Sequence, residues 1–137
     1  MKTAWPLQQA LYTRLAAQLT IAGGVHDHVP MAEDGSAPLV KTYPYVVIGE
    51  SSEREFDCDE TTGADAEITV NVWSRYRGRK EVKQVMGEIH TALHRQSLSV
   101  DGADFGFMTY EFGDDFVEPD GLTRHGVMRF RVVLDHN

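Results

Sequence analysis

The apolar residues between Ala66 and Leu93 change their spacing part-way along the stretch, and this change limits the folds open to the chain. In the segment 66–74, AEITVNVWS, apolar residues occupy every second position, which is the period of a β-strand with one buried face. After a short basic segment they return at intervals of three and four, which is the period of an amphipathic helix. This helical stripe consists of Val82, Val85, Met86, Ile89 and Leu93. A strand therefore leads directly into a helix, and each has one face to bury.

A second helix is predicted near the start of the chain. Four leucines recur at every fourth position, namely Leu7, Leu11, Leu15 and Leu19. Pro6 suits the beginning of a helix, and Gly23-Gly24 supplies a left-handed stop. We expect this helix over about residues 6–22.

Three further segments have the composition of strands. Pro44–Glu50 is rich in β-branched residues, and Val127–Leu134 alternates with Met128 and Phe130 on one face. Leu98–Val100 and Phe105–Phe112 are weaker strand candidates around a turn. Residues 25–43 show no sustained period, although a short strand near residues 25–29 is compatible with them.

The resulting order of elements is α-β-β-α-β-β, which predicts an α+β fold. We expect a largely antiparallel four-stranded sheet with two helices packed on one face. The first two strands form a long β-hairpin whose polar, acidic tip spans about residues 51–65. The length of 137 residues suits one domain covering 1–137.

Charge and cysteine content limit the classes of function. The formal net charge of -8 argues against general nucleic-acid binding, which depends on a basic surface. The single cysteine, Cys58, allows no disulfide within one chain and agrees with a reducing compartment. No stretch approaches the roughly 18 apolar residues of a membrane span, and the first 15 residues lack the apolar core of a signal peptide. We therefore expect no membrane association.

Candidate metal sites are incomplete. His90 and His94 have i, i+4 spacing, but Thr91 stands where zinc proteases have Glu. His26 and His28 alternate without a nearby ligand cluster. The acidic segment from residue 57 resembles a calcium loop, but its sixth and twelfth positions are Thr62 and Ile68. We expect no metal.

No enzyme signature is present either. The sequence contains no GxSxG, P-loop or GxGxxG motif. Carboxylates on both sides of Cys58 would raise the pKa of its thiol, which argues against a nucleophile. We predict that the protein is not an enzyme and takes no cofactor.

The charges are segregated along the chain. Five of the 13 basic residues lie within nine positions: Arg75, Arg77, Arg79, Lys80 and Lys83. Eight of the 21 acidic residues lie on the predicted hairpin: Glu50, Glu53, Glu55, Asp57, Asp59, Glu60, Asp65 and Glu67. Cations at a helix N-terminus oppose its dipole unless an anion sits there.

Three interpretations of the basic cluster stay open at this point: a solvated loop, a DNA-binding surface, or a patch that docks an acidic neighbour. The chain itself offers many carboxylates, so copies could meet head to tail, and such contacts close into rings when the rotation allows. We predict an oligomer or tail interface formed by Arg75, Arg77, Arg79, Lys80, Glu53, Glu55, Phe56, Asp57 and Asp59. Phe56 is the expected apolar anchor of the acidic tip.

Three segments in this order resemble the tail-completion (tail-terminator) family of tailed phages, prophages and phage-like gene transfer agents. The segments are PYVVIGE, VNVWSRYRGRKEVKQVMGEIHTALH and DGLTRHGVMRFRV. The N-terminal helix and VPMAEDGSAPLV also fit, so the resemblance covers nearly the whole chain.

The resemblance implies a structural function. It implies a small α+β subunit that assembles as a homo-oligomeric ring, usually a hexamer, at the head-proximal end of the tail tube. The ring stops tube polymerisation and joins the tail to the head connector, while DNA passes through its bore without specific binding. The protein would be made in the bacterial cytoplasm and reside in the virion tail. The alternative from another class is a small nucleic-acid-binding or regulatory module that uses Arg75–Lys83.

Overall fold

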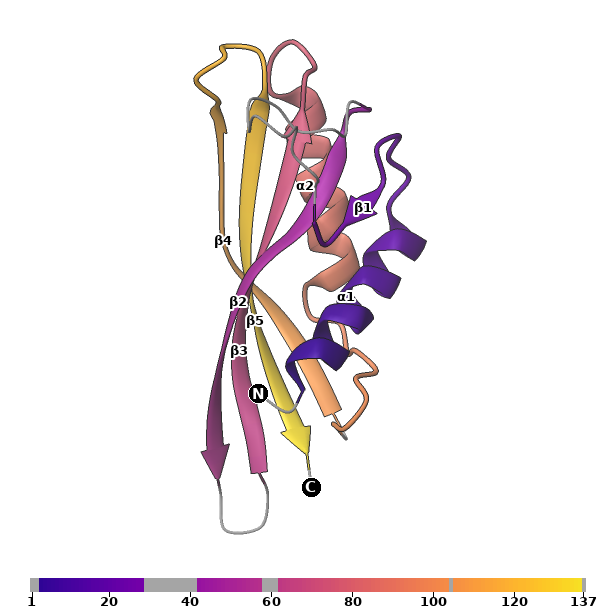
Figure 1. Cartoon of the computed structure of the whole chain (residues 1–137), viewed down its shortest axis with the longest axis vertical. Helices are drawn as coiled ribbons and strands as arrows, with labels where there is room; N and C mark the ends of the chain where they lie inside the picture. Colours follow the sequence, from indigo (N-terminus) through magenta and orange to yellow (C-terminus); the bar gives the residue numbers. More distant parts are fainter. Residues whose placement is uncertain (1–2, 29–41, 58–61, 104, 137) are drawn as a thin grey trace.

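The structure is a computed structural model that describes residues 3–28, 42–57, 62–103 and 105–136. Within these residues the chain forms two helices and five strands (Figure 1). They are α1 (Ala4–Gln18), β1 (Val25–His26), β2 (Tyr45–Asp57), β3 (Thr62–Ser74), α2 (Lys80–Leu93), β4 (Phe105–Val117) and β5 (Arg124–His136). The predicted α+β class is confirmed.

The strands form one sheet in the order β1-β2-β3-β5-β4. β2, β3, β5 and β4 pair antiparallel, and β1 runs parallel to β2. The prediction of four strands is therefore wrong by one. β1 has only two residues, and they pair Val25 with Val46 and His26 with Val47. A segment this short shows no period, because its place depends on β2 rather than on its own pattern.

Several predicted boundaries are also corrected. β2 continues through the segment that was predicted as a hairpin tip, and Glu53 and Glu55 pair there with Ala66 and Ala64 of β3. β4 and β5 are each longer than predicted, and Leu98 and Val100 are buried outside any named strand. α1 spans Ala4–Gln18 rather than 6–22, since Leu19 is already extended. The β-branched Thr20 and Ile21 that follow disfavour further helix.

The core lies between one face of the sheet and the two helices. α1 rests on β1, β2 and α2, while α2 contacts β3, β4 and β5. The predicted arrangement of both helices on one face is thus confirmed. The largest buried side chains include Leu11, Leu15, Ile48, Ile68, Ile89, Leu93, Met108, Met128 and Phe130.

Gly126 allows α2 to approach the sheet closely. A Cβ atom at this position would lie 2.8 Å from the sulfur of Met86 and 3.1 Å from Cγ2 of Val82. Neither distance is tolerable without movement of the helix side chains. The absence of a side chain at Gly126 therefore sets how near α2 packs to β5.

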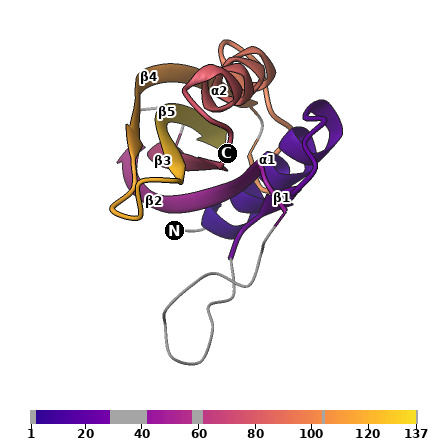
Figure 2. The ribbon, with the colours of Figure 1, turned by 90° about the horizontal axis from the view of Figure 1, so that it is seen from above.

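The other face of the sheet carries no described helix. Residues that share this open face include Trp73 of β3, His125 and Arg131 of β5, and Phe112 and Phe116 of β4. The strands are long and strongly twisted, and Figure 2 shows the sheet curling when it is viewed along the long axis of the molecule.

Candidate interface surfaces

The predicted basic cluster begins in the loop between β3 and α2. Ser74, at the end of β3, is buried; its hydroxyl donates to Glu81 Oε1 (2.7 Å) and accepts from the backbone N–H of Tyr76 (3.2 Å). This places the Glu81 carboxylate in the first turn of α2, where it complements the helix dipole. The loop is therefore held to the helix it precedes.

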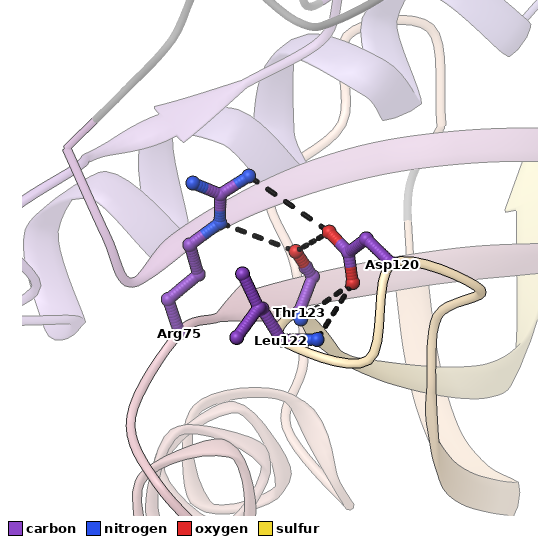
Figure 3. Close-up of polar contacts among 4 residues, drawn as sticks. All are labelled: Arg75, Asp120, Leu122 and Thr123. Atoms are coloured by element: carbon purple, nitrogen blue, oxygen red, sulfur yellow. Dashed lines mark hydrogen bonds and ion pairs between the residues drawn. The ribbon is translucent and has the colours of Figure 1, made fainter.

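Arg75 reaches across to the turn between β4 and β5 (Figure 3). Its Nε donates to Thr123 Oγ1 (3.2 Å), and its Nη2 lies 3.9 Å from Asp120 Oδ2. Asp120 also accepts from the Thr123 hydroxyl (2.6 Å) and from the N–H groups of Leu122 and Thr123 (both 2.9 Å). These hydrogen bonds, that of the Thr123 hydroxyl first, lower the pKa of Asp120 to about 2.

Arg79 also has a carboxylate partner within the chain. Its Nε lies 3.4 Å from Asp115 Oδ2 of β4. Arg124 Nε donates to the carbonyl of Gly78 (3.3 Å), which ties the same loop to β5. Thus Arg75 and Arg79, both predicted to meet another subunit, find acidic partners on β4 or on the β4–β5 turn.

Arg77 and Lys80 differ from these two arginines. Both side chains are exposed, and no ion pair joins either of them to another residue in the described ranges. Their role at an interface stays a prediction. Like Lys83, which is also exposed, they keep a charge that no ion pair within the described ranges neutralises and that is available to an external anion.

A row of aromatic rings lies beside this loop. Trp73 stacks on His125 (ring centroids 3.8 Å apart) and on Tyr45 (6.3 Å), and Tyr45 contacts Tyr43 (5.2 Å). The Arg75 guanidinium lies 4.9 Å from the centre of the Tyr43 ring, within cation–π range. Sequence analysis missed this row, whose only signal was Trp73 on the second face of the alternating strand.

Burial within this row changes two pKa values. Desolvation, aided by Tyr43, raises the pKa of Tyr45 to about 12. His125 is bonded through Nδ1 to Glu118 Oε1 (2.7 Å) and through Nε2 to Asn71 Oδ1 (2.8 Å). Desolvation lowers the pKa of His125 below its ordinary value, although the Glu118 carboxylate acts in the opposite direction. A neutral ring carries a single N–H, so it donates to only one of these two oxygens, and only the protonated ring donates to both.

The histidine pair on α2 is unsuited to metal binding. The rings of His90 and His94 lie 4.6 Å apart, but Nδ1 of His94 accepts a hydrogen bond from the Tyr110 backbone N–H (3.0 Å). In a neutral imidazole the accepting nitrogen holds the lone pair, so Nε2 carries the proton and cannot ligate. Across the described ranges, no group of three or more His, Cys, Asp or Glu side chains is placed to hold a metal ion.

The acidic residues of the hairpin have several roles. Glu53 Oε1 accepts a hydrogen bond from the Thr3 hydroxyl (3.3 Å), which brings its carboxylate to the N-terminus of α1. Asp65 makes a two-pronged ion pair with Arg131, and this hydrogen bonding lowers the pKa of Asp65. Phe56 and Asp57 belong to β2, although the structure describes only their backbone, and Asp59 lies outside the described residues.

The acidic strand end and the basic loop lie at opposite ends of the molecule. Figure 1 shows β2 finishing at one end of the long axis and α2 beginning at the other. The 13 residues of β2 span about 40 Å. Charges this far apart are screened from each other, because the Debye length is about 8 Å at physiological ionic strength.

Comparison with known protein families matches residues 9–135 to one family, described as tail completion protein gp17. The chain belongs to this family. The tail completion protein gp17 of Bacillus phage SPP1 is 27% identical to it over 95 residues, which cover 69% of this chain and 70% of that protein. Membership of the tail completion family makes the chain a structural component of a phage-type tail. The resemblance noted in the sequence is confirmed.

The fold also occurs in a virion. A chain in the virion of a native gene transfer agent (GTA) particle superposes with a TM-score of 0.77 at 21% identity, covering 97% of each chain. At this identity the likeness concerns the fold. No helix among the described residues is long and apolar enough to cross a bilayer.

Proposed function

We propose that this member of the tail completion family caps the head-proximal end of the tail tube as a hexameric ring. The ring stops tube growth and joins the tail to the head connector, and DNA passes through its bore without specific binding. The observation that carries the proposal is the family match over residues 9–135, which takes in α2, β1 to β4, most of α1 and all of β5 but its last residue. The subunit acts by shape and contact, without a cofactor.

The distribution of charge supports contacts at the two ends of the subunit. The exposed cations Arg77 and Lys80 lie at one end of the long axis, and β2 finishes at the other end with Glu53, Glu55 and Asp57. A subunit charged in this way meets carboxylates of a neighbour or of the tail tube with its basic end.

The alternative of a nucleic-acid-binding module has less support. DNA binding draws its affinity from cations that are free to neutralise phosphates. Arg75 and Arg79 are already placed beside Asp120 and Asp115, which lowers the positive potential of the cluster. The formal net charge of -8 opposes DNA as well.

Two measurements test the proposed function. The protein, carrying a small label, is supplied to particles whose own copy has been deleted, and the label is located by electron microscopy. We expect it at the head-proximal tail end, and we expect tails of abnormal length without it. Label along the whole tube, or normal joined particles in the deletion, contradicts the proposal. A gel-shift assay across salt concentrations then examines the DNA-binding alternative, for which we expect no tight complex.

A further inference from the structure

Two exposed aromatic patches lie on opposite flanks of the molecule. The first is on α1, where Trp5 and Tyr12 are 61% and 47% exposed. The second is on β4, where Phe112 and Phe116 are 51% and 41% exposed. Figure 2 shows α1 and β4 on opposite sides of the long axis, and β4 is the edge strand farthest from β1. Exposed Trp, Tyr and Phe side chains in clusters mark interaction sites.

The α1 patch borders a groove. Trp5 and Tyr12 lie two helical turns apart, on one flank of α1 beside the stripe of buried leucines. Together with Val25, His26 and Asp27 they line a hollow of about 440 Å³ between α1 and β1. This hollow has room for an aromatic side chain.

The β4 patch projects from the open face of the sheet. Phe112 and Phe116 pair across to Arg129 and His125 of β5, so their side chains point to the same face. They are about 13 Å apart along the strand, while Trp5 and Tyr12 are about 10 Å apart along the helix. The two pairs can therefore interleave.

The edge of β4 is poorly suited to adding a strand. Backbone bonds from Arg95, Leu98 and Met108 already cover its first half. In its second half the N–H of Asp115 is bonded to the carboxylate of Asp114 (2.9 Å), and a bulge interrupts the register between Tyr110 and Phe112. Charged and bulged edges resist strand addition. A partner at this flank is thus expected to use the side chains of the open face.

Charge indicates what this partner is. The β4 strand carries three acidic residues, Glu111, Asp114 and Asp115, in a chain with a formal net charge of -8. Among both helices and the four long strands, α1 alone contains no Asp or Glu. The α1 patch of a second copy therefore brings one carboxylate to this flank, that of Asp27 in the groove, and none from the helix itself.

We propose that Phe112 and Phe116 of one subunit pack against Trp5 and Tyr12 of the next, as the lateral contact of the ring. This inference rests on the proposed function, because two different patches on opposite flanks make a head-to-tail contact, which closes into a ring when the rotation between subunits allows. The charged ends of the long axis then face along the tail, toward tube and connector.

Two variants, each lacking one of the two aromatic patches and here called blocked variants, test the contact. In one, Trp5→Gln and Tyr12→Gln remove the α1 patch; in the other, Phe112→Thr and Phe116→Thr remove the β4 patch. All four positions are exposed, so each variant should fold, as circular dichroism verifies. We expect each variant alone to need at least about tenfold more protein for assembly than wild type, measured by native mass spectrometry. The matched controls Trp5→Phe with Tyr12→Phe, and Phe112→Leu with Phe116→Leu, should assemble like wild type.

Mixing the two blocked variants gives the decisive result. Each retains one intact patch, so a head-to-tail contact predicts a 1:1 heterodimer and nothing larger. Dimers formed by either variant alone overturn the inference, as does ring formation by either variant at wild-type concentration. If the blocked variants form rings normally but these rings fail to attach to tails, the patches contact the tail tube instead. That result also overturns the inference. Wild-type protein that is monomeric both free and on tails overturns the proposed function and this inference together.

Discussion

Asp120 organises the β4–β5 turn through hydrogen bonds from Thr123 and Leu122, so its ionisation is coupled to the conformation of the turn. Its pKa in the folded protein is about 2, below the ordinary value of 3.8. A depressed carboxyl pKa contributes stability that is complete above the ordinary value and is lost as pH falls through the folded one. The turn should therefore loosen between about pH 4 and pH 2.

This titration can be observed by NMR. We expect the amide shifts of Leu122 and Thr123 to titrate with a midpoint near the folded pKa of about 2. In a Thr123→Val variant, which lacks the strongest hydrogen bond to the carboxylate, the midpoint should move upward. A midpoint at the ordinary value in the wild-type protein would show that the turn does not bind the ionised carboxylate.

His125 offers a second titration, with fluorescence as its readout. Because burial lowers its pKa below 6.5, the neutral form is favoured, and the stability it contributes is present above pH 6.5 and declines as the pH falls below it. The ring stacks on Trp73, and a protonated imidazole quenches indole emission. In a Trp5→Phe background, emission from Trp73 should fall with a midpoint below pH 6.5. The transition should vanish in His125→Gln. A midpoint above pH 6.5 in the Trp5→Phe protein would contradict a lowered pKa of His125.

At the level of elements, the contact between α2 and β5 depends on a missing side chain. A methyl group at Gly126 meets Met86 and Val82, so Gly126→Ala should lower the free energy of unfolding by about 1–3 kcal/mol. Gly87 on α2 is the matched control, since a Cβ there meets nothing within 4 Å. Gly87→Ala should raise stability by about 0.5–1 kcal/mol. Urea denaturation measures both; equal effects of the two substitutions contradict this account of the packing.

Elements with a clear apolar period were predictable, and those positioned by their neighbours were not. The leucine stripe of α1 and the alternation in β3 predicted their type because each buries one regular face. The second half of β2 was missed, since Glu53 and Glu55 carry no apolar pattern and the buried residues there, Ala64 and Ala66, belong to β3.

The candidate site was predicted in the same partial way. The basic residues of the site could be found from the sequence, because they lie within nine consecutive positions before and at the start of α2. The partners of Arg75 and Arg79 could not, since Asp120 and Asp115 approach only when β5 pairs between β3 and β4. Their separation of more than thirty positions in sequence gives no local signal.

For the whole molecule, the opposite charges at the two ends predict a salt-sensitive attachment. Reversal of the free cations, Arg77→Glu with Lys80→Glu, should leave the monomer folded because both side chains are exposed. It should weaken tail attachment by about 0.2–1 kcal/mol for each lost pair, repeated in every subunit. The difference from wild type should be largest at low salt, where charges are least screened.

Pull-down of tails across a salt series measures this effect, with Arg77→Lys and Lys80→Arg as the charge-preserving control. The control should attach like wild type. If the reversed variant completes tails normally but loses a tight, salt-dependent DNA complex that the wild type forms, the basic cluster serves DNA binding instead.

The position of β5 between β3 and β4 also has a consequence for biosynthesis. Its pairs join residues far apart in sequence, from Ser74 with Arg124 to Thr62 with His136. The ribosome makes this central strand after the other four, so until then β3 and β4 each lack the strand that pairs with their backbone edge. A nascent chain that stops before Arg124 cannot complete the sheet. Any assembly built from this fold therefore excludes subunits whose synthesis stops before Arg124.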